Sequence, residues 1–112
     1  MKKLVYILLF IFISVNSFGQ KNDDNMSIEL TSINVYPNPF NENTKISFYS
    51  SQNSLITFIV QDVLGNIVKS EKILLNKGEN TIPFYKKKLS SGIYIYSLKT
   101  KDNIISKRFV IK

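Results

Sequence analysis

The sequence has 112 residues and a formal net charge of +7, and 44% of its residues are hydrophobic, a composition typical of one small folded domain. It contains neither cysteine nor histidine, which excludes disulfides, thiolate metal sites and the commonest general base. We therefore expect a basic, non-catalytic protein without a metal or another cofactor.

The N-terminus has the pattern of a secretory signal peptide. Two lysines precede an uncharged apolar stretch of ten residues, 4–13, and small and polar residues follow it. The small residues Ser17 and Gly19 predict cleavage between Gly19 and Gln20. A permanent membrane anchor is the alternative, but it needs an apolar run of about 20 residues. Loss of residues 1–19 removes two lysines and lowers the net charge from +7 to +5.

The rest of the chain has the pattern of a β-protein. Residues 20–32 form a short polar leader in which no core is expected. From Ile33 onward, alternating apolar and polar residues are interrupted by turn residues, and no segment has helical periodicity. The expected strands are 33–36, 44–49, 55–62, 67–75, 80–85, 93–99 and 104–112. Short strands at intervals of roughly ten residues predict an antiparallel β-sandwich for the domain 33–112.

Individual residues predict where several of these strands lie. Pro37 and Pro39 end the first strand, because proline fixes φ and cannot donate to a sheet ladder. Segment 55–62 is apolar on both of its faces, which predicts a strand in the middle of a sheet. Gly65 permits the turn of a hairpin. Pro83 predicts an edge strand or a bulge.

Four blocks of the sequence, 35–40, 62–68, 89–96 and 107–112, occur in the order found in a known family. With these blocks, residues 33–112 resemble the type A C-terminal sorting domain of the type IX secretion system of Gram-negative bacteria. Each block alone is a weak signal, whereas four in order beside a signal peptide are specific. The positions that match the family's motifs, and that we expect to serve in recognition, are Tyr36, Pro37, Asn38, Pro39, Phe40, Asp62, Gly65, Gly92, Tyr94, Lys107, Phe109, Val110 and Lys112.

This resemblance implies an immunoglobulin-like sandwich that is not an enzyme. It implies export to the periplasm, recognition by the outer-membrane translocon and by shuttle and sortase-like proteins, and no stable membrane span after signal removal. The implied destination is the outer-membrane surface or the extracellular space, where such domains are commonly cleaved and the cargo is joined to a lipopolysaccharide. The sequence departs from the family in two respects. Asn66 replaces a residue that is often basic, and only the 13 residues 20–32 stand where the family carries its cargo.

Alternative interpretations of the same residues stay open. Residues 37–39 are either a rigid turn or part of the surface that the translocon recognises. The basic residues of 86–88 and 107–112 are either a solvated surface or an anion-binding face for a lipopolysaccharide or an acidic translocon surface. Nucleic acid is disfavoured because the protein is exported. The chain as a whole could instead be a stand-alone secreted immunoglobulin-like binding or adhesion module, or a gene that has lost its cargo region.

Overall fold

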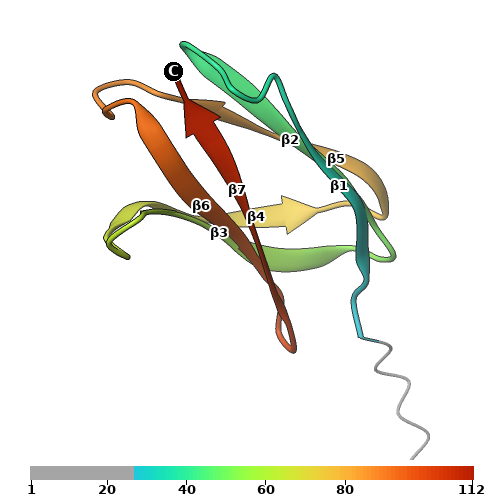
Figure 1. The fold of residues 1–112 in the computed structure, drawn as a ribbon. Coiled ribbons are helices and arrows are strands. Elements are labelled where there is room, and N and C mark those ends of the chain that lie inside the picture. The colour runs from blue at the N-terminus through green and yellow to red at the C-terminus, as the bar shows by residue number, and fades with distance from the viewer. Residues whose placement is uncertain (1–26) are drawn as a thin grey trace, which may run out of the picture.

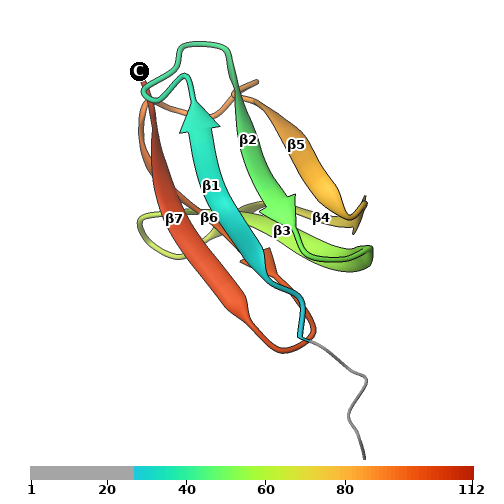
Figure 2. The same ribbon diagram turned by 90° about the vertical axis from the view of Figure 1, so that its right-hand side faces the viewer.

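The computed structural model describes residues 27–112, which form two facing β-sheets (Figures 1 and 2). The strands are β1 (Leu30–Tyr36), β2 (Asn43–Ser50), β3 (Ser54–Asp62), β4 (Ile67–Leu75), β5 (Gly78–Tyr85), β6 (Gly92–Lys99) and β7 (Ile104–Ile111). One sheet has the order β1-β2-β5 and the other β4-β3-β6-β7, and neighbouring strands within each sheet are antiparallel. The predicted all-β, immunoglobulin-like sandwich is confirmed.

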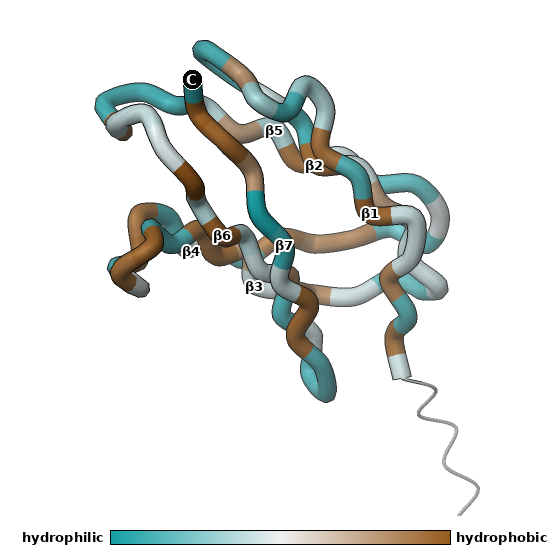
Figure 3. The backbone as a smooth tube through the Cα atoms, in the orientation of Figure 1, coloured by the Kyte–Doolittle hydropathy of each residue, from teal (hydrophilic) through white to brown (hydrophobic). Residues whose placement is uncertain are grey.

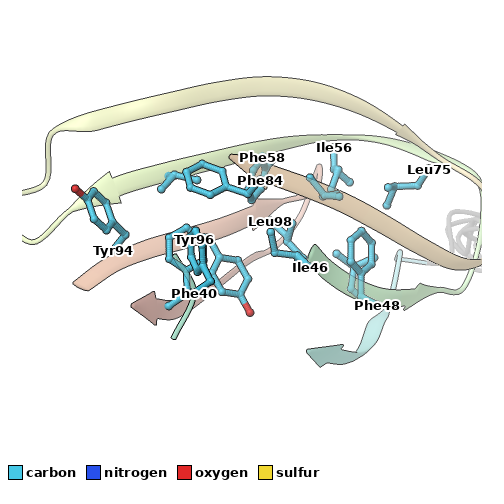
Figure 4. Packing of buried hydrophobic residues seen from close by; sticks show 14 of the residues in the cluster. Phe40, Ile46, Phe48, Ile56, Phe58, Leu75, Phe84, Tyr94, Tyr96 and Leu98 are labelled. Carbon is cyan, nitrogen blue, oxygen red and sulfur yellow. The ribbon is translucent and has the colours of Figure 1, made fainter. Parts of the chain in front are cut away.

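One hydrophobic core fills the space between the sheets, because alternate side chains of each strand point into it. In β3, for example, Ile56, Phe58 and Val60 are buried, whereas the residues between them are partly exposed. Figure 4 shows the core running along the molecule from Tyr94 at one end to Phe48 at the other. Burial of each large apolar side chain contributes about 1.5–3 kcal/mol to folding. The core accounts for the alternation seen in the sequence.

The first strand begins earlier than the alternation predicts. β1 starts at Leu30, inside the expected leader 20–32, and Leu30 is buried while Ile28 packs against the core. The pairing of β1 with β2 shifts register between Thr31 and Asn34, where Ser32 has a φ of 54°. An irregularity of this kind interrupts the two-residue period of a strand. The sequence pattern therefore does not reveal residues 30–32 as part of β1.

Other strand positions agree with the predictions. β3 lies in the interior of its sheet, between β4 and β6. Within residues 27–112, β5 is an edge strand that pairs only with β2, and its Pro83 lies opposite Lys45. Gly65, with a φ of +88°, lies in the turn that joins β3 to β4. The predictions from Pro83, an edge strand, and from Gly65, a hairpin turn, are therefore both confirmed.

The predicted signal peptide, and its cleavage between Gly19 and Gln20, lie outside the described residues. Between residues 27 and 112, the chain forms no helix long and apolar enough to cross a membrane.

Candidate recognition surface at one end of the sandwich

The four sequence blocks converge at one end of the sandwich (Figure 1). Asp62 at the end of β3 pairs with Tyr94 near the start of β6. Gly92, where β6 begins, pairs with Ile111 at the end of β7. The connection between β1 and β2 reaches the same place. We call this region the motif end and define it as residues 36–40, 62–66, 92–94 and 109–112.

Hydrogen bonds tie the β1–β2 connection to the end of β7. The backbone N–H of Phe40 donates to the carbonyl of Val110 at 3.0 Å, and the N–H of Lys112 donates to the carbonyl of Phe40 at 2.8 Å. The N–H of Val110 donates to the side-chain oxygen Oδ1 of Asn38 at 2.9 Å. Phe40 and Ile111 form a short parallel bridge. The first and last motif blocks are therefore one structural unit.

Aromatic packing beneath these hydrogen bonds joins the same blocks. The fully buried ring of Phe109 lies 5.3 Å from the ring of Phe40 in an edge-to-face arrangement and 5.6 Å from the ring of Tyr96 in a stacked one. Phe84 of β5 also contacts Phe109, with 5.0 Å between ring centres. Such ring pairs contribute about 0.5–1.5 kcal/mol each beyond the area that they bury. Phe109 and Phe40 therefore stabilise the motif end from within the core, and their buried rings are not available to a partner.

Asp62 holds the β3–β4 hairpin in one conformation. Its Oδ1 accepts the backbone N–H groups of Leu64 at 3.0 Å and Asn66 at 2.9 Å, and its Oδ2 accepts the Asn66 side-chain amide at 3.0 Å. The backbone N–H of Gly65 donates to the Asp62 carbonyl at 3.1 Å. Hydrogen bonds from the Asn66 side chain and then from its backbone lower the pKa of Asp62 below its ordinary 3.8, because they favour the ionised carboxylate.

Tyr94 connects the start of β6 to the loop that precedes it by a side-chain hydrogen bond. Its side chain is buried, and its hydroxyl donates to the carbonyl of Ser90 at 2.8 Å. A tyrosine bonded to the backbone a few residues upstream is the tyrosine corner found in immunoglobulin-like sandwiches. Gly92, between the two residues, has a φ of +149°, which side-chain-bearing residues rarely adopt. The block 89–96 is therefore a structural corner.

The predicted recognition residues divide into an inward and an outward group. Phe40, Tyr94 and Phe109 are buried, and Val110 is half-buried. Those with exposed side chains are Tyr36, Pro37, Asn38, Pro39, Lys107 and Lys112. Tyr36 is 77% exposed. Apart from Lys107, which lies farther along β7, the outward group is the part of the motif end that a partner could contact directly.

The structure separates the two basic groups that the sequence suggested as one face. Lys86, Lys87 and Lys88 lie in the β5–β6 connection and line a pocket together with Lys69 of β4. Lys107 lies along β7, where its Nζ is 3.5 Å from the carbonyl oxygen of Ile33 in β1. The β4–β5 edge and the β1–β7 edge are on opposite sides of the sandwich (Figure 2).

Three supporting residues are not among the positions that the sequence predicted for recognition. The buried Thr44 donates from Oγ1 to the carbonyl of Pro37 at 2.6 Å and fixes the β1–β2 connection. Asn66 bonds Asp62, and Ser90 bonds Tyr94. The last two pairs have a four-residue spacing, the only sequence signal that could have revealed them. Nowhere in residues 27–112 do three histidine, cysteine, aspartate or glutamate side chains gather closely enough to hold a metal ion.

Comparisons with known proteins agree with the fold. The chain is similar to part of the solved structure of β-glucosidase 3B from Thermotoga neapolitana, with 15% identity and a TM-score of 0.53 over 76% of this chain. It is also similar to part of a β-glucosidase from Erythrobacter marinus, with 10% identity and a TM-score of 0.51 over 77% of this chain. The chain spans only 16% and 15% of these structures, so the likeness concerns the fold alone.

A comparison with curated protein sequences gave no match. The model of one protein family, described as the secretion system C-terminal sorting domain, matches residues 34–112. This match covers all four motif blocks and every strand from β2 to β7. The chain therefore belongs to the C-terminal sorting domain family of the type IX secretion system.

Proposed function

We propose that this protein is a folded sorting signal whose motif end is recognised in the periplasm by the outer-membrane translocon of the type IX secretion system. Recognition directs the chain, with whatever is attached to it, across the outer membrane. Shuttle and sortase-like proteins of the same system are the expected further partners. The exposed members of the motif end, above all Tyr36, Asn38 and Lys112, make the direct contacts, while the buried members hold those contacts in place.

Family membership supports the coarser part of this proposal. The family has a sorting role in type IX secretion, is non-catalytic, and implies secretion to the outer-membrane surface or the extracellular space. The observation that supports the finer part is the pair of hydrogen bonds from Phe40 and Val110 that joins the first and last motif blocks. Because residues so distant in sequence form one end of the molecule, a single partner surface can contact both of them.

A fusion experiment tests the proposal. Residues 27–112, which include Ile28 and Leu30 of the core, are fused to an exported reporter in a host with a type IX system, and surface delivery is measured by protease accessibility. The double variant Tyr36→Ala/Lys112→Ala should leave the reporter in the periplasm. Both side chains are exposed, so the variant should fold normally by circular dichroism.

The matched control is Tyr49→Ala/Lys77→Ala, which removes the same two residue types from exposed positions at the opposite end of the sandwich. This control should reach the surface like the unchanged fusion. Periplasmic retention of the unchanged fusion would show that the domain does not sort. Equal delivery of both double variants would show that the motif end is not the recognised surface.

The stand-alone binding module remains the second candidate, and mass spectrometry of the native surface protein separates it from a sorting signal. A surface species that keeps residues 33–112 favours a binding module. Loss of those residues at the surface favours sorting followed by cleavage.

A further inference from the structure

A pocket lined by lysines opens at the β4–β5 edge of the sandwich. Its volume is about 460 Å³, and Val68 and Lys69 of β4 line it together with residues 84–89 of β5 and the β5–β6 connection. The lining combines four apolar or aromatic side chains with four lysines and has no acidic side chain. Lys69 is paired with Glu71 at 3.5 Å, whereas none of the lysines in 86–88 has an ion-pair partner within residues 27–112. The pocket is therefore suited to an anion.

Three of the four pocket lysines, those of 86–88, lie on a turn that backbone hydrogen bonds fix. The N–H of Lys86 donates to the carbonyl of Glu42 at 2.9 Å, and the N–H of Leu89 donates to the carbonyl of Lys86 at 3.0 Å. Lys87 has a φ of 50°, a left-handed conformation that is uncommon for a residue with a side chain. A residue stays in such a conformation only where its surroundings fix it, and these positions are enriched at ligand sites.

An exposed apolar tip lies next to the pocket along the chain. Val63 and Leu64, at the tip of the β3–β4 hairpin, are 67% and 84% exposed, and Ile67 is 61% exposed. Ile67 directly precedes Val68, which lines the pocket. Figure 3 shows the hairpin as a hydrophobic segment at the same end of the sandwich as the hydrophilic β5–β6 connection. The Asp62 carboxylate fixes the hairpin, so these side chains are presented to solvent by a defined loop.

We propose that the lysine pocket and the β3–β4 hairpin tip form a docking surface for a membrane that carries anionic phosphate headgroups. The lysines contact the phosphates, and Val63 and Leu64 enter the boundary between headgroups and acyl chains. Peripheral membrane binding combines these two contributions, buried apolar area and attraction to anionic lipid. The inference takes only the destination, the outer-membrane surface, from the proposed function, and it names the part of the chain that would contact anionic lipid there.

Two observations favour lipid over an acidic protein as the occupant. The charges come from lysines, which bind phosphate as mobile point charges, and not from arginines, whose planar fork suits the fixed carboxylates of a protein surface. The apolar side chains project from a hairpin tip, a convex shape that can enter a lipid interface. A protein partner would instead need a matching concave pocket.

Vesicle flotation tests the proposal with the exported protein. Vesicles of phosphatidylcholine alone are compared with vesicles that also contain phosphatidylglycerol. Binding should require the anionic lipid and should weaken with rising salt, because salt screens exposed charges. In Lys86→Gln/Lys87→Gln/Lys88→Gln the affinity should fall by roughly a hundredfold, since each of the three lysines near an anionic surface contributes about fivefold. In Val63→Ser/Leu64→Ser it should also fall.

Two matched control variants test whether the loss of vesicle binding is specific to the lysine pocket and the hairpin tip. Lys77→Gln/Lys99→Gln/Lys101→Gln makes the same charge change at exposed positions elsewhere, and Leu55→Ser/Leu74→Ser removes two exposed apolar side chains from the outer sheet face. Both should bind like the unchanged protein. All variants share one N-terminus, so differences between them report on the substituted residues.

The proposal fails if the unchanged protein does not float with anionic vesicles, or if the controls lose as much binding as the test variants. It also fails if a poly-glutamate peptide binds with the same lysine dependence and without need of Val63 and Leu64, since an acidic protein is then the partner. None of these outcomes depends on delivery of the reporter fusion. The vesicle experiment and the fusion experiment therefore test the membrane proposal and the sorting proposal independently of each other.

Discussion

Asp62 and Tyr94 show how single polar side chains fix the motif end. Asp62 organises a hairpin through three hydrogen bonds to its carboxylate, and Tyr94 closes a corner through one hydroxyl. These four bonds reach only a few residues along the chain, and they hold the β3–β4 hairpin and the start of β6 in place. Removal of either should change local geometry before it changes the fold as a whole.

The Asp62 hydrogen bonds predict a pH-dependent hairpin. The folded pKa lies below the ordinary 3.8, so these bonds stabilise the hairpin at pH values above 3.8. This stabilisation is lost as the pH falls through the lowered pKa. The backbone amide shifts of Leu64 and Asn66, followed by NMR from neutral to strongly acidic pH, should move together with the Asp62 carboxyl.

The variant Asp62→Asn should remove this acid transition, because an amide does not ionise. Asp102→Asn, in the exposed β6–β7 turn, is the matched control and should keep it. An unchanged acid transition of Leu64 and Asn66 in Asp62→Asn would contradict the assignment.

The tyrosine corner predicts a stability difference between two tyrosines. Tyr94→Phe removes the hydroxyl that donates to Ser90 and should lower the free energy of unfolding by about 1 kcal/mol, the usual net value of one such bond. Tyr36→Phe removes a hydroxyl from a side chain that is 77% exposed and should change it by less than about 0.5 kcal/mol. Urea unfolding measures both. Equal effects of the two substitutions would exclude a corner role for Tyr94.

At the scale of elements, β7 completes both the sheet and the motif end. It pairs with β6 along its whole length, and its end is bonded to the β1–β2 connection of the other sheet. The side chain of Phe109 in β7 points into the core, where its ring contacts aromatic rings from both sheets. β7 therefore joins the two sheets at the motif end.

A double-mutant cycle tests this link. Phe40→Leu and Phe109→Leu, measured singly and together by urea unfolding, should show a coupling energy of about 1 kcal/mol, because the two rings are in contact. The pair Phe48→Leu and Phe109→Leu should show little coupling, since Phe48 lies at the other end of the core (Figure 4). Similar coupling in both cycles would mean that the Phe40–Phe109 contact has no special role.

The elements of this fold were largely predictable from the sequence, because apolar alternation, turn glycines and Pro83 all express local rules. The first three residues of β1 were not, since the irregularity at Ser32 breaks the alternation. The predicted motif residues could be found from the family resemblance, but not which of them are buried. Contacts such as Asn38 with Val110 depend on how distant segments meet, and alternation within one strand carries no information about that.

At the scale of the whole molecule, one core serves both sheets, so the domain should unfold as a unit. Phe109→Ala should lower the free energy of unfolding by about 3–5 kcal/mol, as expected for a buried aromatic ring. This is a large share of the roughly 5–15 kcal/mol that stabilises a typical domain. Ile104→Ala in the same strand, at a side chain that is 60% exposed, should have a far smaller effect.

Tyrosine fluorescence and circular dichroism should report the same unfolding midpoint for each of these variants. Separate midpoints in Phe109→Ala would show that the motif end unfolds independently of the remaining sandwich.

Truncations within β7 are a poor test of recognition, because they remove core side chains together with surface ones.

The bonds between the β1–β2 connection and β7 join positions 72 residues apart, Asn38 and Val110. In a chain whose β7 has not yet paired, these two residues are far apart and the motif end does not exist. A receptor that binds this end consequently selects finished molecules and passes over unfolded or incomplete ones. Under the proposed recognition of the motif end, the binding event that selects the chain for sorting would therefore also report that the chain has folded.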